Sequence, residues 1–340
     1  MNKKIRNLLF YFGLVILMFF VIKKMLGDGI YDVLELLKTI EFKYIALILI
    51  CVGAYNFMEG IIVWLTAKNT AAGLEFKSGI LSGYYTAVFR ALTFGTGSAA
   101  ALIYYLNKKN ISPEVGYGIV TVSYSFHKIT VALYVTVGLL INFGFFRENY
   151  GEYFGYIIAG YILTVIIVAV LLGICLSSKF HNIILKTSGR ILKNTKFSGK
   201  LQLIEKKLNS LRNETGSILR DRKNALKMIA AEFLKLTCWY LIPYISLKGM
   251  GCPEDVTVIY SLGIISLVVA LVGVIPTPGN VASVEIIFTI MFSVLVSETQ
   301  AAAAMIIYRF STYYGAFFVA VIIYFAATRL VNPFKRHGHA

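Results

Sequence analysis

Charged residues are scarce in this sequence, and their scarcity excludes most classes of soluble protein. Only 15% of the 340 residues are charged, whereas 58% are hydrophobic, against about 25% and about 45–50% in soluble globular chains. This composition argues against a soluble enzyme, a disordered chain and a fibrous protein. Apolar stretches long enough to cross lipid recur along almost the whole chain. We therefore expect a single membrane domain over residues 1–340.

Cysteine and histidine are also few, with four of each. The cysteines have no metal or redox spacing, and three of them lie in apolar runs, so we expect no disulfide framework. The sequence contains no HExxH, P-loop, GxSxG or CxxC motif. We therefore expect no metal ion, no cofactor and no catalytic residue.

Acidic residues are in deficit, and the excess of Lys and Arg predicts the topology. The chain has 33 Lys and Arg against 17 Asp and Glu, a net charge of +16. Cytoplasmic loops of membrane proteins retain Lys and Arg, which favours a membrane orientation signal over nucleic-acid binding. Residues 179–228 alone hold 13 Lys and Arg against 3 Asp and Glu. We interpret this segment as a basic cytoplasmic loop and place both termini on the same side.

The apolar segments predict an all-α polytopic membrane protein. They cover residues 8–26, 43–66, 79–106, 115–143, 153–178, 229–248, 257–275, 281–297 and 301–328. Helices are expected because lipid cannot satisfy exposed backbone groups. With about 20 residues needed for each crossing, we expect about six full spans plus two re-entrant helical hairpins.

The two hairpins are predicted where an apolar stretch begins and ends on the same side of the membrane. Residues 79–106 lie between cytoplasmic lysines and are broken at Phe94-Gly95-Thr96-Gly97-Ser98. Residues 257–297 lie between acidic connections and are broken at Pro276-Thr277-Pro278-Gly279-Asn280. Two prolines and a glycine within five residues end a helix. The first hairpin would enter from the cytoplasm and the second from outside.

The order of the segments favours an inverted repeat. Residues 43–143 form a span, a hairpin and a span, and residues 229–328 form the same series in the opposite orientation. Transporters with this layout bind their substrates at interrupted helices near mid-membrane. The alternative of eight or nine plain spans stays open.

Ionisable and conformationally special residues within the apolar segments are the candidates for function, because charges are costly in lipid. Lys128 and Arg309, with half-helix ends at Gly97 and Asn280, suit an anionic group such as a lipid phosphate. Glu285 would pair with Arg309 or contact a cationic headgroup. The candidate headgroup-binding residues are Arg90, Gly97, His127, Lys128, Pro276, Pro278, Gly279, Asn280, Glu285, Tyr308 and Arg309.

Four charged residues have structural alternatives to a functional role. Glu59 and Arg90 suit a structural ion pair as well as a functional role. Glu232 and Lys235 fall in the first turns of segment 229–248, where snorkelling to the cytoplasmic interface explains them at least as well as function.

Three segments of the sequence resemble a known family. Residues 276–285 read PTPGNVASVE and resemble the PTPGG-x-G-x-x-E signature of the lysylphosphatidylglycerol synthase transmembrane-region family, the flippase domain of the multiple peptide resistance factor. Tyr308-Arg309-Phe310 resembles the tyrosine–arginine motif of its last helix, and residues 94–98 resemble its earlier glycine-rich segment. Where that family often has Glu-Arg, this chain has His127-Lys128, so Lys128 keeps the positive charge.

The resemblance implies a lipid flippase. It would move an aminoacylated, lysyl-phosphatidylglycerol-like or other anionic phospholipid between the leaflets of a bacterial plasma membrane, with resistance to cationic peptides as the outcome. The soluble synthase domain of the family is not among these 340 residues, so the label of phosphatidylglycerol lysyltransferase has no support from them. A membrane-embedded lipid-modifying transferase and a docking subunit for a separate synthase stay open as alternatives. We expect phospholipids as ligands and no nucleic acid; a separate synthase and a second copy of the chain stay open as partners.

Overall fold

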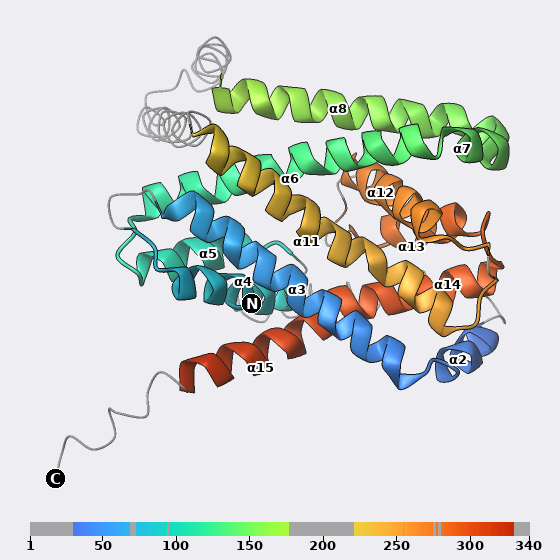
Figure 1. The fold of residues 1–340 in the computed structure, drawn as a ribbon, viewed down its shortest axis with the longest axis horizontal. Coiled ribbons are helices and arrows are strands. Elements are labelled where there is room, and N and C mark those ends of the chain that lie inside the picture. Colours follow the sequence, from blue (N-terminus) through green and yellow to red (C-terminus); the bar gives the residue numbers. More distant parts are fainter. Residues whose placement is uncertain are drawn as a thin grey trace, which may run out of the picture.

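The fold is built from helices throughout the part of the chain that the structure describes. The computed structural model describes residues 30–68, 73–93, 95–176, 221–253, 255–274, 277 and 280–329, and every regular element in these ranges is a helix (Figure 1). The predicted all-α polytopic membrane fold is confirmed. The span expected at 8–26 and most of the basic loop lie outside the described residues.

Seven α-helices are described before residue 177 and five after residue 220. The first set comprises α2 (Ile30–Lys38), α3 (Phe42–Ala67), α4 (Phe76–Leu92), α5 (Ser98–Asn107), α6 (Pro113–Ile141), α7 (Phe143–Tyr150) and α8 (Phe154–Leu176). The second set comprises α11 (Arg222–Gly249), α12 (Val258–Val274), α13 (Ser283–Phe292), α14 (Glu298–Phe310) and α15 (Ala316–Arg329). A 3₁₀ turn, Gly151–Tyr153, joins α7 to α8, and a π-helical turn, Ser311–Gly315, joins α14 to α15. Helix α2 was not predicted.

Four of the described helical stretches are long and apolar enough to cross a membrane. They are Phe42–Ala67, Pro113–Ile141, Phe143–Val170 and Glu298–Thr328. Helix α11 has 28 residues, a length of about 42 Å at about 1.5 Å per residue, but it carries several charged side chains. These helices make the chain a multi-pass membrane protein.

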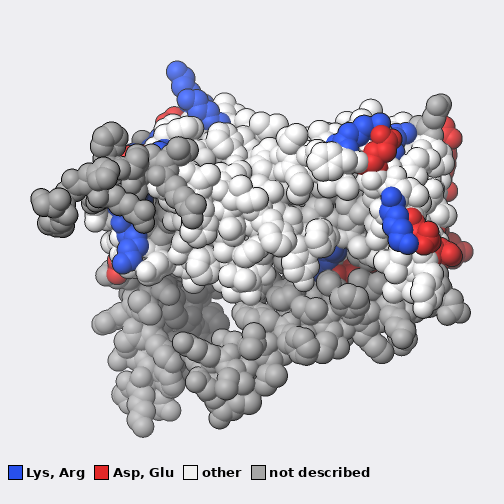
Figure 2. Space-filling model, turned by 90° about the horizontal axis from the view of Figure 1, so that it is seen from below, with Lys and Arg blue, Asp and Glu red and all other residues white. Residues whose placement is uncertain are grey.

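The long helices run lengthwise through the molecule and give it two ends (Figure 1). What we call the basic end contains the start of α11 and the turns next to α3, α4 and α5, with Lys68, Lys77, Lys108, Lys109, Arg222 and Lys223. What we call the acidic end contains α2, α7 and the starts of α12 and α14, with Asp32, Glu35, Glu148, Glu152, Asp255 and Glu298. Figure 2 shows most charged atoms gathered at both ends. The surface between them is uncharged apart from one small recessed spot of charged atoms, which is the pattern expected of a chain that crosses lipid.

Helices α4 and α5 form a hairpin that opens toward the basic end (Figure 1). They contain 17 and 10 residues, fewer than the roughly 20 that a crossing needs. The chain reverses between Thr93 and Gly97, where Gly95 has a φ of +89°, a conformation that costs glycine little. This break falls where the sequence predicted it.

Helices α12 and α13 form a second hairpin, and it opens toward the acidic end (Figure 1). These helices contain 17 and 10 residues. At the tip, Asn280 and Ala282 have φ values of +54° and +70°, which are uncommon for residues other than glycine. Pro276, Pro278 and Gly279, which the sequence predicted to break the helix, lie outside the described residues.

Glycines bring the first hairpin against α3. A Cβ atom on Gly83 would lie 2.6 Å from the backbone nitrogen of Gly60, and one on Gly79 would lie 2.5 Å from Trp64 Cβ. Small residues at such positions let two membrane helices approach closely. This contact fixes α4 beside α3 and so places Arg90 near Glu59.

Helix α11 begins earlier than the hydropathy predicted. Its first residue is Arg222, and the Asp221 carboxylate accepts a hydrogen bond of 3.0 Å from the backbone N–H of Asn224, which caps the helix. Residues 222–228 therefore belong to the helix and not to the basic loop. Glu232 and Lys235 consequently lie about three turns inside α11, not in its first turns.

Candidate functional site

A polar cavity of about 210 Å³ lies where both hairpins meet the long helices. Gly95 from the first hairpin tip and Asn280 from the second both line it. The full lining comprises Tyr55, Arg90, Gly95, His127, Leu236, Trp239, Tyr240, Val268, Val269, Val272, Asn280, Val284, Tyr308, Arg309, Thr312 and Tyr313. Segments far apart in the sequence thus contribute to one site within the apolar middle of the molecule.

On one side of the site, five charged or titratable residues from α3, α4, α6 and α11 form what we call the four-helix network. Lys235 Nζ lies 2.8 Å from Glu59 Oε2 and 2.7 Å from Glu232 Oε2. His127 Nδ1 lies 3.2 Å from the same Glu232 oxygen. Arg90 Nη2 lies 3.9 Å from Glu59 Oε1, so the ion pair expected between these two residues is present.

The centre of this network is buried. Glu232 and Lys235 are 1% and 2% exposed, so the snorkelling interpretation was wrong for both. A buried charge is strongly unfavourable unless an opposite charge and hydrogen bonds compensate it. Lys235 therefore needs both carboxylates, and each carboxylate needs Lys235.

Aromatic rings enclose the cationic part of the network. The Arg90 guanidinium lies 5.3 Å from the Tyr55 ring centroid and 5.9 Å from that of Trp239, within the range of a cation–π interaction. Within the described ranges, Arg90 Nη1 is buried and makes no hydrogen bond. Because a guanidinium carries five N–H donors, Arg90 retains donors for a ligand in the cavity that it lines.

A second buried ion pair connects the second hairpin to α14. Arg309 Nε donates to Glu285 Oε1 over 2.7 Å, and Arg309 Nη2 donates to the Asn280 carbonyl over 3.1 Å. The guanidinium also lies 5.2 Å from the Tyr313 ring centroid. Glu285 is fully buried, and in the described part of the chain its Oε2 atom has no hydrogen-bond partner.

A π-helical turn follows this pair directly. Residues Ser311–Gly315 interrupt the α-helical pattern between α14 and α15, and Thr312 and Tyr313 from this turn line the cavity. Single π-helical turns occur frequently at functional sites, because they redirect side chains. Here the turn directs two more polar side chains to the site of Arg309.

The structure brings most of the predicted site residues together. Arg90, His127, Asn280, Tyr308 and Arg309 line the cavity, and Glu285 contacts it through Arg309. Pro276, Pro278 and Gly279 lie outside the described residues.

Lys128 and Gly97 lie elsewhere. Neither belongs to the described lining of the cavity. Lys128 Nζ is 5.5 Å from the Tyr124 ring centroid. Gly97 precedes α5, and its backbone N–H donates to Thr93 Oγ1 over 2.7 Å. The roles predicted for these two residues stay predictions.

Sequence reasoning missed the aromatic and hydroxyl side chains of the cavity. Tyr55, Trp239, Tyr240 and Thr312 line it, but aromatic residues make up 14% of the chain and no spacing distinguishes these from packing residues. Glu59, Glu232 and Lys235 carried a usable signal, since each is a charge within an apolar run.

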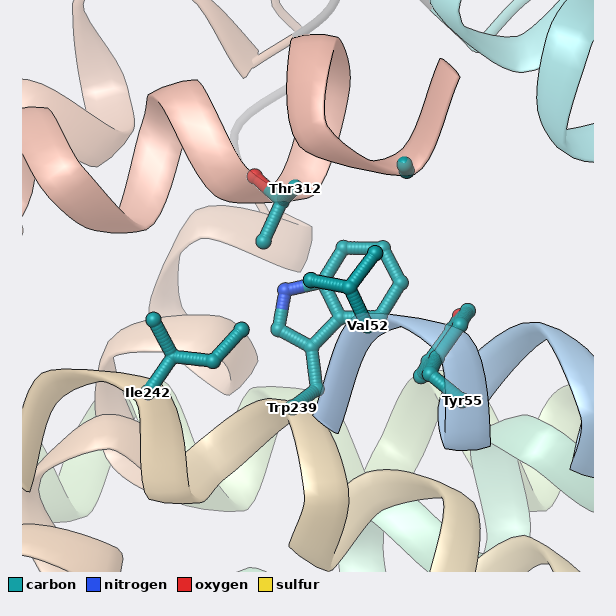
Figure 3. Close-up of a pocket in the computed structure, with 6 residues that line it drawn as sticks. Val52, Tyr55, Trp239, Ile242 and Thr312 are labelled. Carbon is teal, nitrogen blue, oxygen red and sulfur yellow. The ribbon is translucent and has the colours of Figure 1, made fainter. Parts of the chain in front are cut away.

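A narrow apolar crevice adjoins the polar cavity (Figure 3). It shares Tyr55, Trp239 and Thr312 with the cavity, and its full lining is Val52, Tyr55, Trp239, Ile242, Thr312 and Ala316. In Figure 3 the side chains of Trp239 and Ile242 rise from α11 toward Thr312. An apolar surface is therefore contiguous with the polar cavity. Among the described residues, no three His, Cys, Asp or Glu side chains are grouped to hold a metal ion.

The fold and the site define a multi-pass membrane protein in which two helical hairpins from opposite ends meet at a charged central cavity. The profile described as "Lysylphosphatidylglycerol synthase TM region" matches residues 7–320. The chain therefore belongs to this family, as the PTPGNVASVE and Tyr-Arg motifs indicated, and the family connects it with membrane lipids. A search among curated proteins found no match.

Proposed function

We propose that this protein is a lipid transporter that moves an aminoacylated, lysyl-phosphatidylglycerol-like or other anionic phospholipid between leaflets. The observation that carries the proposal is that Arg90 and Arg309 line one cavity together with the tips of both hairpins. Two arginines at membrane depth are costly. Binding of a lipid phosphate group would explain why two arginines lie there.

The side chains suit a phospholipid headgroup. Arginine binds phosphate oxygens with two parallel hydrogen bonds, and Arg90 has a buried donor that makes no hydrogen bond to the described residues. The Glu285 carboxylate beside Arg309 would accept hydrogen bonds from the amines of an aminoacyl group. We keep Lys128 in the proposed site as a cation next in sequence to His127.

The crevice beside the cavity suits the rest of the lipid. The crevice is too narrow to hold a water molecule in this structure. Its walls of Val52, Ile242, Ala316 and aromatic rings would have to separate to contact the first part of an acyl chain, while the headgroup occupies the charged cavity. A lipid is amphiphilic in the same way, so one molecule would use both surfaces at once.

The two hairpins would act as gates. One opens toward the basic end and the other toward the acidic end (Figure 1), and both tips reach the cavity. Movement of one hairpin at a time would expose the cavity to one leaflet and then to the other, as in transporters built from inverted repeats. We propose that the basic end is cytoplasmic, that the membrane is a bacterial plasma membrane, and that transport reduces its sensitivity to cationic peptides.

Reconstituted liposomes test the proposal. We would measure leaflet exchange of fluorescent phosphatidylglycerol and lysyl-phosphatidylglycerol by wild-type protein, Arg309→Ala and Arg147→Ala. Arg147 is a matched control because it is exposed on α7, at the acidic end. We expect exchange by the wild type and by Arg147→Ala, and a loss of at least about tenfold in Arg309→Ala, since a charged hydrogen-bonded contact contributes about 1.5–3 kcal/mol. Undiminished exchange by Arg309→Ala would refute the role of this residue. No exchange of either lipid by folded wild-type protein would refute the proposed function.

A further inference from the structure

The charges at the cavity balance. In the part of the chain that the structure describes, three cations and three carboxylates line it or contact its lining; they are Arg90, Lys235, Arg309, Glu59, Glu232 and Glu285. Each of these side chains contacts one of opposite sign within 4 Å. Lys128 does not belong to the described lining of the cavity, so the cavity itself has no excess positive charge with which to receive an anion.

A phosphodiester that entered this balanced site would leave it with one uncompensated negative charge. Such a charge is strongly unfavourable away from water. The imbalance disappears if a proton binds at the same time. The group that takes the proton has to be able to gain one without losing an ion pair, and it has to lie at the cavity.

His127 meets these conditions. It lines the cavity, and its Nδ1 lies 3.2 Å from Glu232 Oε2. That oxygen also contacts the Lys235 ammonium at 2.7 Å, so the carboxylate is an acceptor and His127 Nδ1 carries the hydrogen. The other ring nitrogen, Nε2, is left to bind a second proton. The resulting imidazolium would strengthen the existing contact with Glu232.

The neighbouring helices offer no competing neutral base. From α11, Glu232 and Lys235 act on His127, and Lys128 does so from its own helix. Glu59 on α3 and Arg90 on α4 belong to the same network, and Arg309 lines the same cavity. Helices α5, α8 and α12, which also pack against α6, contain no charged residue. Each carboxylate is already paired with a cation, so its protonation would leave that buried cation without its partner.

We propose that His127 binds a proton together with each anionic lipid headgroup, so that the site takes up an acidic phospholipid and a proton as a pair. The inference rests on the proposed lipid transport. It adds that the uptake of a proton depends on the net charge of the lipid headgroup. A headgroup that brings its own positive charge, such as an aminoacyl amine, needs no proton. The same cavity would thus accept both lipid classes with different proton stoichiometries.

Proton uptake on binding is the direct test. Purified protein in detergent would receive short-chain phosphatidylglycerol or short-chain lysyl-phosphatidylglycerol at about pH 7.5, above the ordinary range of histidine, in weak buffer with a pH indicator. We expect uptake of about one proton per bound phosphatidylglycerol and none with lysyl-phosphatidylglycerol.

The diagnostic variant is His127→Asn, whose amide can still donate to Glu232 but cannot titrate. It should bind phosphatidylglycerol about tenfold more weakly, since about 1.4 kcal/mol corresponds to tenfold, and without proton uptake, while binding of lysyl-phosphatidylglycerol is retained. Thr121→Ala is the matched control, because Thr121 lies on the same helix and its hydroxyl bonds the Tyr117 carbonyl. If His127→Asn does not fold, as judged by gel filtration, His127→Gln would be tested in its place.

The outcomes separate this inference from the function on which it rests. The inference is overturned if the wild type binds phosphatidylglycerol without taking up a proton, or if binding requires sodium instead of a proton. Either result leaves lipid transport standing. Uptake that persists in the His127 variant also overturns the inference. Failure of folded wild-type protein to bind either lipid overturns both.

Discussion

Lys235 on α11 donates a hydrogen bond of 2.8 Å to Glu59 on α3, and this contact joins the first helices of the two segments that the sequence predicts to be repeats. The two helices pack along each other through the centre of the molecule (Figure 1). Both side chains belong to the four-helix network at the cavity. We therefore expect that loss of this contact lowers the stability of the protein and also impairs its function.

Replacement of Lys235 by Met should destabilise the protein severely. The substitution leaves Glu59 and Glu232 without their ammonium partner, and removal of one partner from a buried ion pair costs about 3–5 kcal/mol. We expect a clear fall in the thermal midpoint measured by fluorescence-detected gel filtration in detergent. Lys38→Met is the control, since Lys38 pairs with Glu35 at the same distance of 2.8 Å but at the exposed surface, where such pairs contribute little. Equal midpoints for the two variants would contradict the prediction.

The sequence predicted the hairpins because their breaks are local. Residues 94–98 and 276–280 combine glycine or proline with apolar flanks, and such residues end helices whatever packs around them. The structure describes helix ends next to both breaks, at Leu92 and at Val274.

The pairing of the charges could not be predicted in the same way. Lys235 and Glu59 are 176 residues apart, and their contact depends on how α11 packs against α3. The start of α11 was missed because residues 222–228 are polar, although Asp221 at the preceding position is a recognisable N-cap. The missed cavity residues, such as Tyr55 and Trp239, have no sequence signal at all, because only tertiary packing selects them from the other aromatic residues.

Replacement of Gly83 by Ala should loosen the first hairpin. A Cβ atom there would lie 2.6 Å from the Gly60 nitrogen, so α4 would have to move away from α3. Overpacking of this kind costs about 1–3 kcal/mol, and displacement of Arg90 should also slow lipid exchange. Gly144→Ala is the matched control, since no atom lies within 4 Å of its added Cβ. A midpoint for Gly83→Ala at or above that of Gly144→Ala would show that the helices do not approach this closely.

Cysteine labelling should place the two ends on opposite sides of the membrane. Lys108→Cys at the basic end and Glu298→Cys at the acidic end are exposed positions, to be tested in a Cys175→Ser background. An impermeant maleimide added to right-side-out vesicles should label Glu298→Cys at once and Lys108→Cys only after permeabilisation. The native Cys252 is a weak competitor, because burial raises the pKa of its thiol to about 11 and the thiolate is the reactive form. The reverse labelling pattern would refute a cytoplasmic basic end.

Replacement of Arg309 by Lys should show whether lipid exchange requires the hydrogen-bonding geometry of the guanidinium or only its positive charge. Lysine keeps the positive charge beside Glu285, but an ammonium cannot reproduce the fork with which the guanidinium bonds both Glu285 and the Asn280 carbonyl. The second hairpin would then lose one of these two hydrogen bonds from Arg309, while the buried carboxylate keeps a cationic neighbour. We expect a small change in thermal midpoint and a fall of about tenfold in lipid exchange, which corresponds to about 1.4 kcal/mol.

Glu285→Gln completes the comparison. It leaves the Arg309 charge without its carboxylate in a buried position, so it should lower the thermal midpoint more than Arg309→Lys does. If Arg309→Lys exchanged lipid at the wild-type rate, charge alone would suffice at this position and the fork would have no role in transport. If both variants lost stability equally, the pair would serve to hold the second hairpin against α14, and the phosphate contact would have to be assigned to Arg90.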